Sequence, residues 1–144
     1  MGTYRTILLL VIFFFNLSFS QTIVGKIYTK DDANKIYGPV LSLTQISTGN
    51  LSNLTNQTTN YIMFGINNGN LIILGDQRKP LYPASVIVNP QDAMKLFSVS
   101  LVRKICLDGN NSITTIELRN NNVLTVTNGN YTLEYSTECP PNCY

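Results

Sequence analysis

The chain has 144 residues, a formal net charge of +2 and a charged fraction of only 12%. This balance gives no electrostatic footprint for nucleic acid or anionic lipid, so neither is expected as a partner. Histidine is absent, which removes the usual general base near neutral pH and the commonest metal ligand. The length favours one domain, and the composition indicates neither a cofactor nor a metal.

The N-terminal segment has the pattern of a cleaved secretory signal. Arg5 precedes an unbroken apolar run over 7–15, and the small residues Ser18 and Ser20 suit a signal peptidase. An uncleaved anchor is the less favoured alternative, because the run is shorter than the roughly 20 apolar residues that cross a bilayer. We therefore expect a secreted or extracellular chain beginning at Gln21 (periplasmic or on the cell surface in a bacterium), without membrane contact after cleavage.

A displacement of sixty positions aligns two halves of the chain without a gap. Residues 29–37 align with 89–97, and Asn-Gly-Asn at 68–70 aligns with the same tripeptide at 128–130. Chance similarity in an Asn-rich chain is the alternative, but a shared helix start, apolar pattern and turn favour a tandem duplication. The expected organisation is a signal at 1–20, a first unit at 21–80, a second unit at 81–140 in the same domain, and a tail at 141–144.

Each half is predicted to begin with a strand and a helix of about two turns. Thr29 and Asn89 are good N-cap residues, and Asp32 and Asp92 stand three positions later, where a capping partner belongs. Pro90 suits the first helical position, where its missing N–H costs nothing. Helices this short need a sheet to pack on.

Strands are predicted for the rest of each half. Asn-Gly at 68–69 and at 128–129 is typical of a tight hairpin turn. The expected fold class is therefore α+β and β-dominated, built from a duplicated strand, short helix and antiparallel meander with a pseudo-two-fold relation. The predicted strands are 40–46, 53–58 (weakly), 61–66, 70–74, 99–107, 113–118, 123–127 and 130–135.

The three cysteines lie in a chain that we expect to reach an oxidising compartment. Cys106 aligns with an aliphatic residue and is predicted to lie on a strand, as a buried free thiol. A meander would place Cys106 and Cys139 at opposite ends of a sheet, too far apart for a bridge. The favoured disulfide is therefore Cys139–Cys143, and a different strand connection would reverse this choice. A redox dithiol and a metal site are both weakly indicated.

Asn-x-Ser/Thr motifs follow the expected signal at five positions. They are glycosylation candidates if the source organism glycosylates, and otherwise reflect the abundance of Asn and Thr. The candidates are Asn50, Asn53, Asn56, Asn110 and Asn130.

Catalytic motifs are not found in the sequence. There is no glycine-rich phosphate loop and no Gly-x-Ser-x-Gly elbow, and no spacing brings two carboxylates together. We therefore assign no catalytic residue and expect a protein that is not an enzyme. A pocket lined by two carboxylates with perturbed ionisation would revive an enzymatic interpretation.

The predicted function is a secreted binding module that contacts an extracellular protein or glycan through a sheet surface. The binding residues are unknown at this point. The alternative is a structural subunit of a surface layer, fibre or coat, in which strand edges of different chains pair and the chain self-associates.

Overall fold

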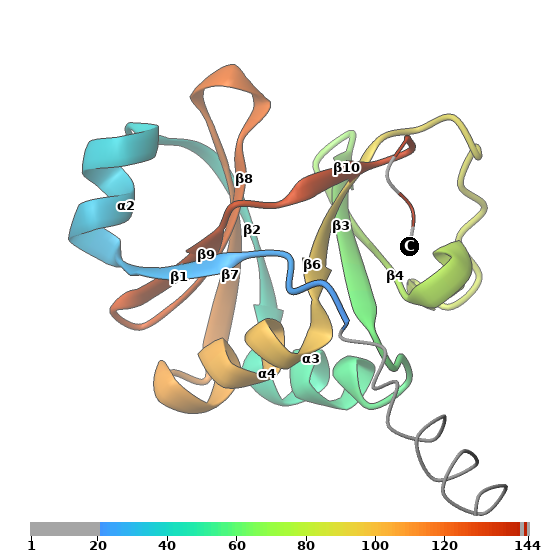
Figure 1. The fold of residues 1–144 in the computed structure, drawn as a ribbon, viewed down its shortest axis with the longest axis horizontal. Helices are drawn as coiled ribbons and strands as arrows, with labels where there is room; N and C mark the ends of the chain where they lie inside the picture. The colour runs from blue at the N-terminus through green and yellow to red at the C-terminus, as the bar shows by residue number, and fades with distance from the viewer. Residues whose placement is uncertain (1–20, 142, 144) are drawn as a thin grey trace, which may run out of the picture.

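The computed structural model describes residues 21–141 and 143, so the expected signal segment lies outside the described part. Strands account for 42% of the described residues and helices, with the 3-10 turns included, for 26%, which confirms a mixed α+β, strand-dominated fold. Two antiparallel sheets and three short helices form it (Figure 1).

The two sheets have five strands each. Sheet A has the order β1–β9–β8–β7–β2, and sheet B has the order β10–β6–β3–β4–β5. The strands are β1 (Lys26–Thr29), β2 (Val40–Ser47), β3 (Tyr61–Asn67), β4 (Asn70–Leu74), β5 (Pro80–Tyr82), β6 (Met94–Ser98), β7 (Ile113–Arg119), β8 (Leu124–Asn128), β9 (Tyr131–Glu134) and β10 (Thr137–Cys139).

Two of the helices carry the chain from one sheet to the other. α3 (Thr48–Thr55) joins β2 of sheet A to β3 of sheet B, and α4 (Val99–Asp108) joins β6 of sheet B to β7 of sheet A. α3 and α4 pack together at the lower end of the molecule in Figure 1. α2 (Lys30–Tyr37) lies apart from them, beside sheet A. Two 3-10 turns, η1 (Asp76–Arg78) and η2 (Asn120–Asn122), complete the fold.

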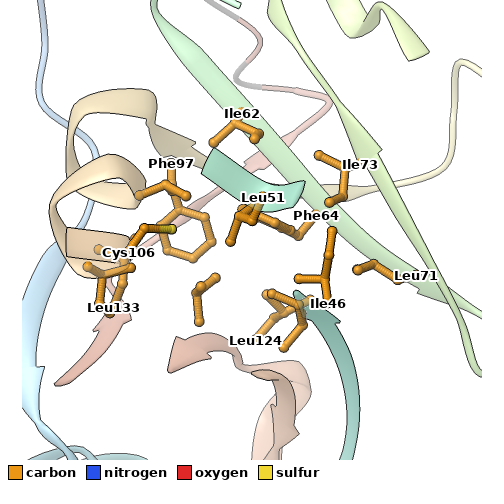
Figure 2. Close-up of a cluster of buried hydrophobic side chains, with 14 of the residues drawn as sticks. Ile46, Leu51, Ile62, Phe64, Leu71, Ile73, Phe97, Cys106, Leu124 and Leu133 are labelled. Atoms are coloured by element: carbon orange, nitrogen blue, oxygen red, sulfur yellow. The ribbon is translucent and has the colours of Figure 1, made fainter. Parts of the chain in front are cut away.

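The main hydrophobic core fills the space between the sheets and is closed by α3 and α4. Side chains from both sheets and both helices meet there (Figure 2). Phe64 of β3 and Phe97 of β6 are fully buried and form an edge-to-face pair with ring centroids 5.9 Å apart. Both sheets contribute side chains to this one core. The inner face of each sheet is therefore buried only when the other sheet is in place.

The sixty-residue duplication is not confirmed. Thr29 caps α2 as predicted, since its Oγ1 accepts a hydrogen bond from the N–H of Asp32. The aligned segment 89–97 does not form a helix, and the predicted cap at Asp92 is wrong: the segment makes a turn and enters β6. The strand is favoured because its alternate side chains are buried on the outer and the inner face of sheet B.

The strands predicted at 53–58 and 99–107 are also wrong, since α3 covers the first half of 53–58 and α4 covers all of 99–107. In α4 the side chains of Val99, Val102 and Ile105 are buried at a spacing of three, which is a helical period. Cys106 is therefore on a helix and not on a strand. In the structure these segments instead connect the two sheets, α3 between β2 and β3 and α4 between β6 and β7.

Both predicted hairpins form, the first with its turn at 68–69 as predicted and the second with its turn at 129–130, one residue later than predicted. Asn67 pairs with Asn70 across a two-residue turn, in which Asn68 and Gly69 have φ of 50° and 79°. Asn128 pairs with Tyr131 across Gly129 and Asn130, and here Gly129 has φ of 56°. Positive φ is the conformation that tight hairpin turns require.

Candidate functional site

The predicted cysteine pairing is confirmed. Cys139 and Cys143 form a disulfide, and Cys106 is a buried free thiol. Burial raises the pKa of Cys106 to about 11, although a hydrogen bond with Thr114 acts in the opposite direction. The thiolate is the reactive form of cysteine, and burial disfavours it at Cys106 near neutral pH.

The five predicted glycosylation candidates are all exposed and lie toward the end of the molecule that carries α3 and α4. The turn of the β8–β9 hairpin is held to this end by Asn128, whose side-chain amide donates to Thr48 Oγ1 and to the carbonyl of Asn111. The candidates occupy α3 and its C-cap (Asn50, Asn53, Asn56), the residue after Gly109 at the end of α4 (Asn110), and this turn (Asn130). Their modification stays a prediction.

A buried polar layer covers the outer face of sheet A. Glu117 Oε2 accepts hydrogen bonds from Arg119 Nη2 at 2.7 Å and from the hydroxyls of Thr125 and Thr127 at 3.0 Å each. Glu117 Oε1 accepts from Thr115. The side chains of the Arg119–Glu117 ion pair are only 0% and 4% exposed, so the pair is sealed from water.

Arg119 also ties α2 to sheet A. Its Nη1 donates to Asn34 Oδ1 at 2.8 Å and to the carbonyl oxygen of Gly38 at 2.6 Å. Its Nε donates to Thr125 Oγ1. A guanidinium bound by both a strand carboxylate and a helix C-terminus holds the two elements in a fixed relation.

A second buried carboxylate, Glu134, lies in the same row across the sheet. Thr125 is opposite Glu117, and the β8–β9 register places Thr125 beside Glu134 as well. Glu134 Oε1 accepts hydrogen bonds from Ser136, while Oε2 is buried without a partner. Burial raises the pKa of Glu134, although the Ser136 contacts and a backbone hydrogen bond from Tyr135 oppose this.

The two carboxylates do not form a catalytic pair in this structure. Glu117 is engaged by four donors, and Glu134 is closed in by its own strand end. We interpret the layer as structural. The layer was not predicted: alternating Thr, Glu and Arg at 115–119 indicates a polar strand face, which would ordinarily be exposed, but α2 lies beside this face and its side chains are buried.

Two adjoining hollows lie around Gly65, Ile66 and Ala93. The larger, about 350 Å³, lies against the β3–β4 hairpin and the segment before β6. The smaller, about 150 Å³, extends between the two sheets. Their remaining lining residues are mainly aliphatic or amide: Asn67, Ile72, Val88, Asp92 and Met94 in the larger, and Phe64, Lys95, Leu118, Asn122 and Leu124 in the smaller. This lining offers no set of groups for covalent or acid–base chemistry.

The edges of the two sheets are unequal. Three of the four are short: β1 has four residues and includes Lys26, while β5 and β10 have three each and include Pro80 and Glu138. The fourth edge, β2, has eight residues with the sequence VLSLTQIS, without a charge or a proline. Short strands, charges and prolines are the usual protection of an edge against pairing with another chain, and β2 lacks all three.

β2 presents apolar side chains and backbone groups to solvent together. Leu41 and Leu43 are 61% and 53% exposed. Thr48 N–H donates to the carbonyl of Ser112 at 2.8 Å, in register with the β2–β7 ladder. Because hydrogen-bonded pairs alternate along antiparallel strands, even-numbered residues of β2 bond to β7. The N–H and C=O of Leu43 and Gln45 therefore point away from the sheet.

Within residues 21–141 and 143, no group of three or more His, Cys, Asp or Glu side chains could hold a metal ion. In the same part of the chain, no helix has the length and apolarity to cross a membrane. No protein-family model, no curated protein and no solved structure matches the chain.

Proposed function

We propose that the chain is a secreted, non-enzymatic binding module that captures an extended segment of a partner protein beside β2. The captured segment adds a sixth strand to sheet A and bonds to the free N–H and C=O groups of Leu43 and Gln45. Main-chain hydrogen bonds supply affinity in this mode of recognition, and exposed side chains such as Leu41 and Leu43 supply selectivity. The single observation behind the proposal is this eight-residue edge without charge or proline, whose ladder to β7 is regular from Ser42 to Ser47 and irregular only between Val40 and Ser42.

A protein partner is better supported than a glycan. Sugar recognition would be favoured by several exposed aromatic side chains gathered on one surface, whereas the one tyrosine pair beside α2, Tyr28 and Tyr37, is half-buried in edge-to-face contact. Tyr61 is buried in sheet B, while Tyr131 and Tyr135 lie at opposite ends of β9. An unpaired strand edge instead matches the backbone of another polypeptide.

The structural-subunit alternative is less well supported. An open fibre of paired strands needs two exposed edges on each copy, because each copy must bind a neighbour on both sides. Among the residues that the structure describes, only β2 is a long edge without charge or proline. Capture of a partner segment needs one edge only.

Two features support action outside the cell. The N-terminal pattern of residues 1–20 is that of a secretory signal. The Cys139–Cys143 disulfide suits an oxidising compartment.

Site-specific photo-crosslinking tests this proposal. A photoreactive amino acid replaces Leu43 in the full chain, which is then expressed and exported in its native cells. The matched control carries it in place of Leu107, which is 76% exposed on α4. We expect one reproducible heterologous adduct from position 43, lost when Gln45→Pro is added and absent from position 107. Equal labelling from both positions, or no heterologous adduct from position 43, would overturn the proposal.

A further inference from the structure

We infer that, without a partner segment, β2 pairs antiparallel with β2 of a second copy of this chain and closes a two-fold dimer. This inference rests on the proposed function in one respect: both use the same edge. It names a second occupant of that edge and makes self-association and partner capture mutually exclusive.

β2 is complementary to itself. In a pairing centred on Thr44, Leu43 of each copy lies opposite Gln45 of the other, and these are the residues whose backbone groups are free. Each such pair exchanges two N–H···O bonds. Because β2 contains no charged residue, no like charges meet across the two-fold axis.

The same pairing covers exposed apolar surface. Residues 43 and 45 point to one face of sheet A, so the two Leu43 side chains become diagonal neighbours across the junction. Leu41 and Leu43 are both more than half exposed in the single chain. Their burial supports association in addition to the backbone bonds.

The assembly stops at two copies. A two-fold interface uses the same surface on both partners. The open β2 edge of each copy is therefore fully occupied by the other copy. The remaining sheet edges are β1, β5 and β10, which are short and carry Lys26, Pro80 and Glu138. The result is a closed dimer with sheet A continuous across both copies.

Analytical ultracentrifugation of the purified secreted chain over a range of concentrations tests the dimer. We expect a monomer–dimer equilibrium that Gln45→Pro weakens about 10- to 100-fold, because two N–H donors are lost per dimer. The N–H of Gln45 does not bond to β7, so the unfolding midpoint of this variant should change little. Gln45→Ala retains the N–H and should still dimerise. A strict monomer at all concentrations, or an unaffected dimer in Gln45→Pro, would overturn the inference.

A second variant keeps the test decisive if Gln45→Pro fails to fold. Leu43→Lys alters a side chain that is 53% exposed and sets two positive charges near each other at the junction. It should abolish the dimer and leave the monomer folded. Persistence of the dimer in this variant would count against β2 as the interface.

Hydrogen exchange locates the interface at single residues. With rising concentration, the amides of Leu43 and Gln45 should gain protection, whereas those of Thr44 and Ile46, which bond to β7, should not change. Photo-crosslinking at position 43 separates the two ideas. A heterologous adduct with a strictly monomeric chain keeps the proposed function and removes the dimer; a homodimer without any heterologous adduct does the reverse.

Discussion

The outer faces of the two sheets are buried by opposite kinds of chemistry. On sheet A, Glu117 and Arg119 form a buried ion pair with threonine hydroxyls beside α2. On sheet B, the equivalent layer is apolar and includes Met63, Leu74 and Leu96. Hydrogen bonds and charges demand fixed partners, whereas apolar contacts depend mainly on volume. Loss of one polar side chain from the outer face of sheet A should therefore lower the free energy of unfolding strongly. A change in the shape of one apolar side chain on the outer face of sheet B should lower it much less.

The two hairpin turns give the largest expected difference. Gly129→Val in sheet A should prevent stable folding, because its added Cβ would lie 2.3 Å from the backbone oxygen of Gly109. Gly69→Val in sheet B has no heavy atom within 4 Å of the added Cβ and should lose only the strain of positive φ, about 1–2 kcal/mol. Urea unfolding followed by circular dichroism measures both. Equal losses would show that Gly109 moves aside freely.

Removal of one member of the buried ion pair is the next largest effect. Arg119→Ala should lower the free energy of unfolding by about 3–5 kcal/mol, because Glu117 would remain buried without its charge partner. Chemical denaturation measures this loss.

Two controls make the contrast between the layers explicit. The double change of Glu117→Gln with Arg119→Met should lose less than Arg119→Ala alone, since no charge is left buried. On sheet B, Leu96→Met should cost less than about 1.5 kcal/mol. If Leu96→Met were as harmful as Arg119→Ala, the proposed difference between the layers would be wrong.

The carboxylates of Glu134 and Asp76 should contribute to the free energy of unfolding with opposite pH dependences. Burial raises the pKa of Glu134, so its contribution to stability is complete below the unfolded pKa and is lost as pH rises through the folded pKa. For Asp76, burial alone would raise the pKa, but hydrogen bonds from the N–H groups of Asn60, Tyr61 and Thr59 outweigh it and lower the pKa. Its stabilisation is present above the unfolded pKa and is lost as pH falls through the folded value.

Thermal unfolding from pH 3 to pH 8 checks the direction of each of these pH dependences. Glu134→Gln should be relatively most favourable at neutral pH, and Asp76→Asn should be most harmful there and progressively less harmful as the pH falls toward 3. The same slope in both variants would mean that one of the two environments has been misassigned.

The smallest effect is expected at the start of α2, the helix beside the polar layer. Asp32 accepts a hydrogen bond from Thr29 Oγ1 at 2.8 Å, and Asp32→Ala should lose about 0.5–1 kcal/mol through the cap. Asp92, its counterpart in the sixty-residue alignment, starts no helix, so Asp92→Ala should be nearly neutral. Denaturation midpoints compare the pair directly, and matching losses would restore a capping role for Asp92.

Sequence signals for caps, turns and the short-range disulfide predicted the structure well. They failed for segments whose secondary structure depends on pairing with a strand distant in sequence. The cap at Thr29, both Asn-Gly hairpins and the Cys139–Cys143 bridge follow from residues close in sequence. Segment 89–97 has a good helix start yet forms a strand, because distant β3 offers it a place in sheet B. Segment 99–107, predicted as a strand, forms a helix whose residues Val99, Val102 and Ile105 are buried at helical spacing.

The candidate site could be anticipated only in part. Residues 40–46 were predicted to be a strand and β2 covers them, but its position at an edge depends on the order of strands, which no local pattern encodes. The polar layer is similar: Glu117 and Arg119 are neighbours in sequence, whereas Asn34 reaches them only through the placement of α2.

The route of the chain through α3 and α4 has a consequence for how the protein comes into being. β1 and β2 find their partners in β9 and β7, so sheet A cannot be completed until residue 134 has been made. Strands β1 and β2, in the N-terminal third, therefore stay unpaired until the C-terminal third of the chain has been synthesised. Sheet A, unlike the β3–β4–β5–β6 part of sheet B, can therefore form only after nearly the whole chain has been synthesised.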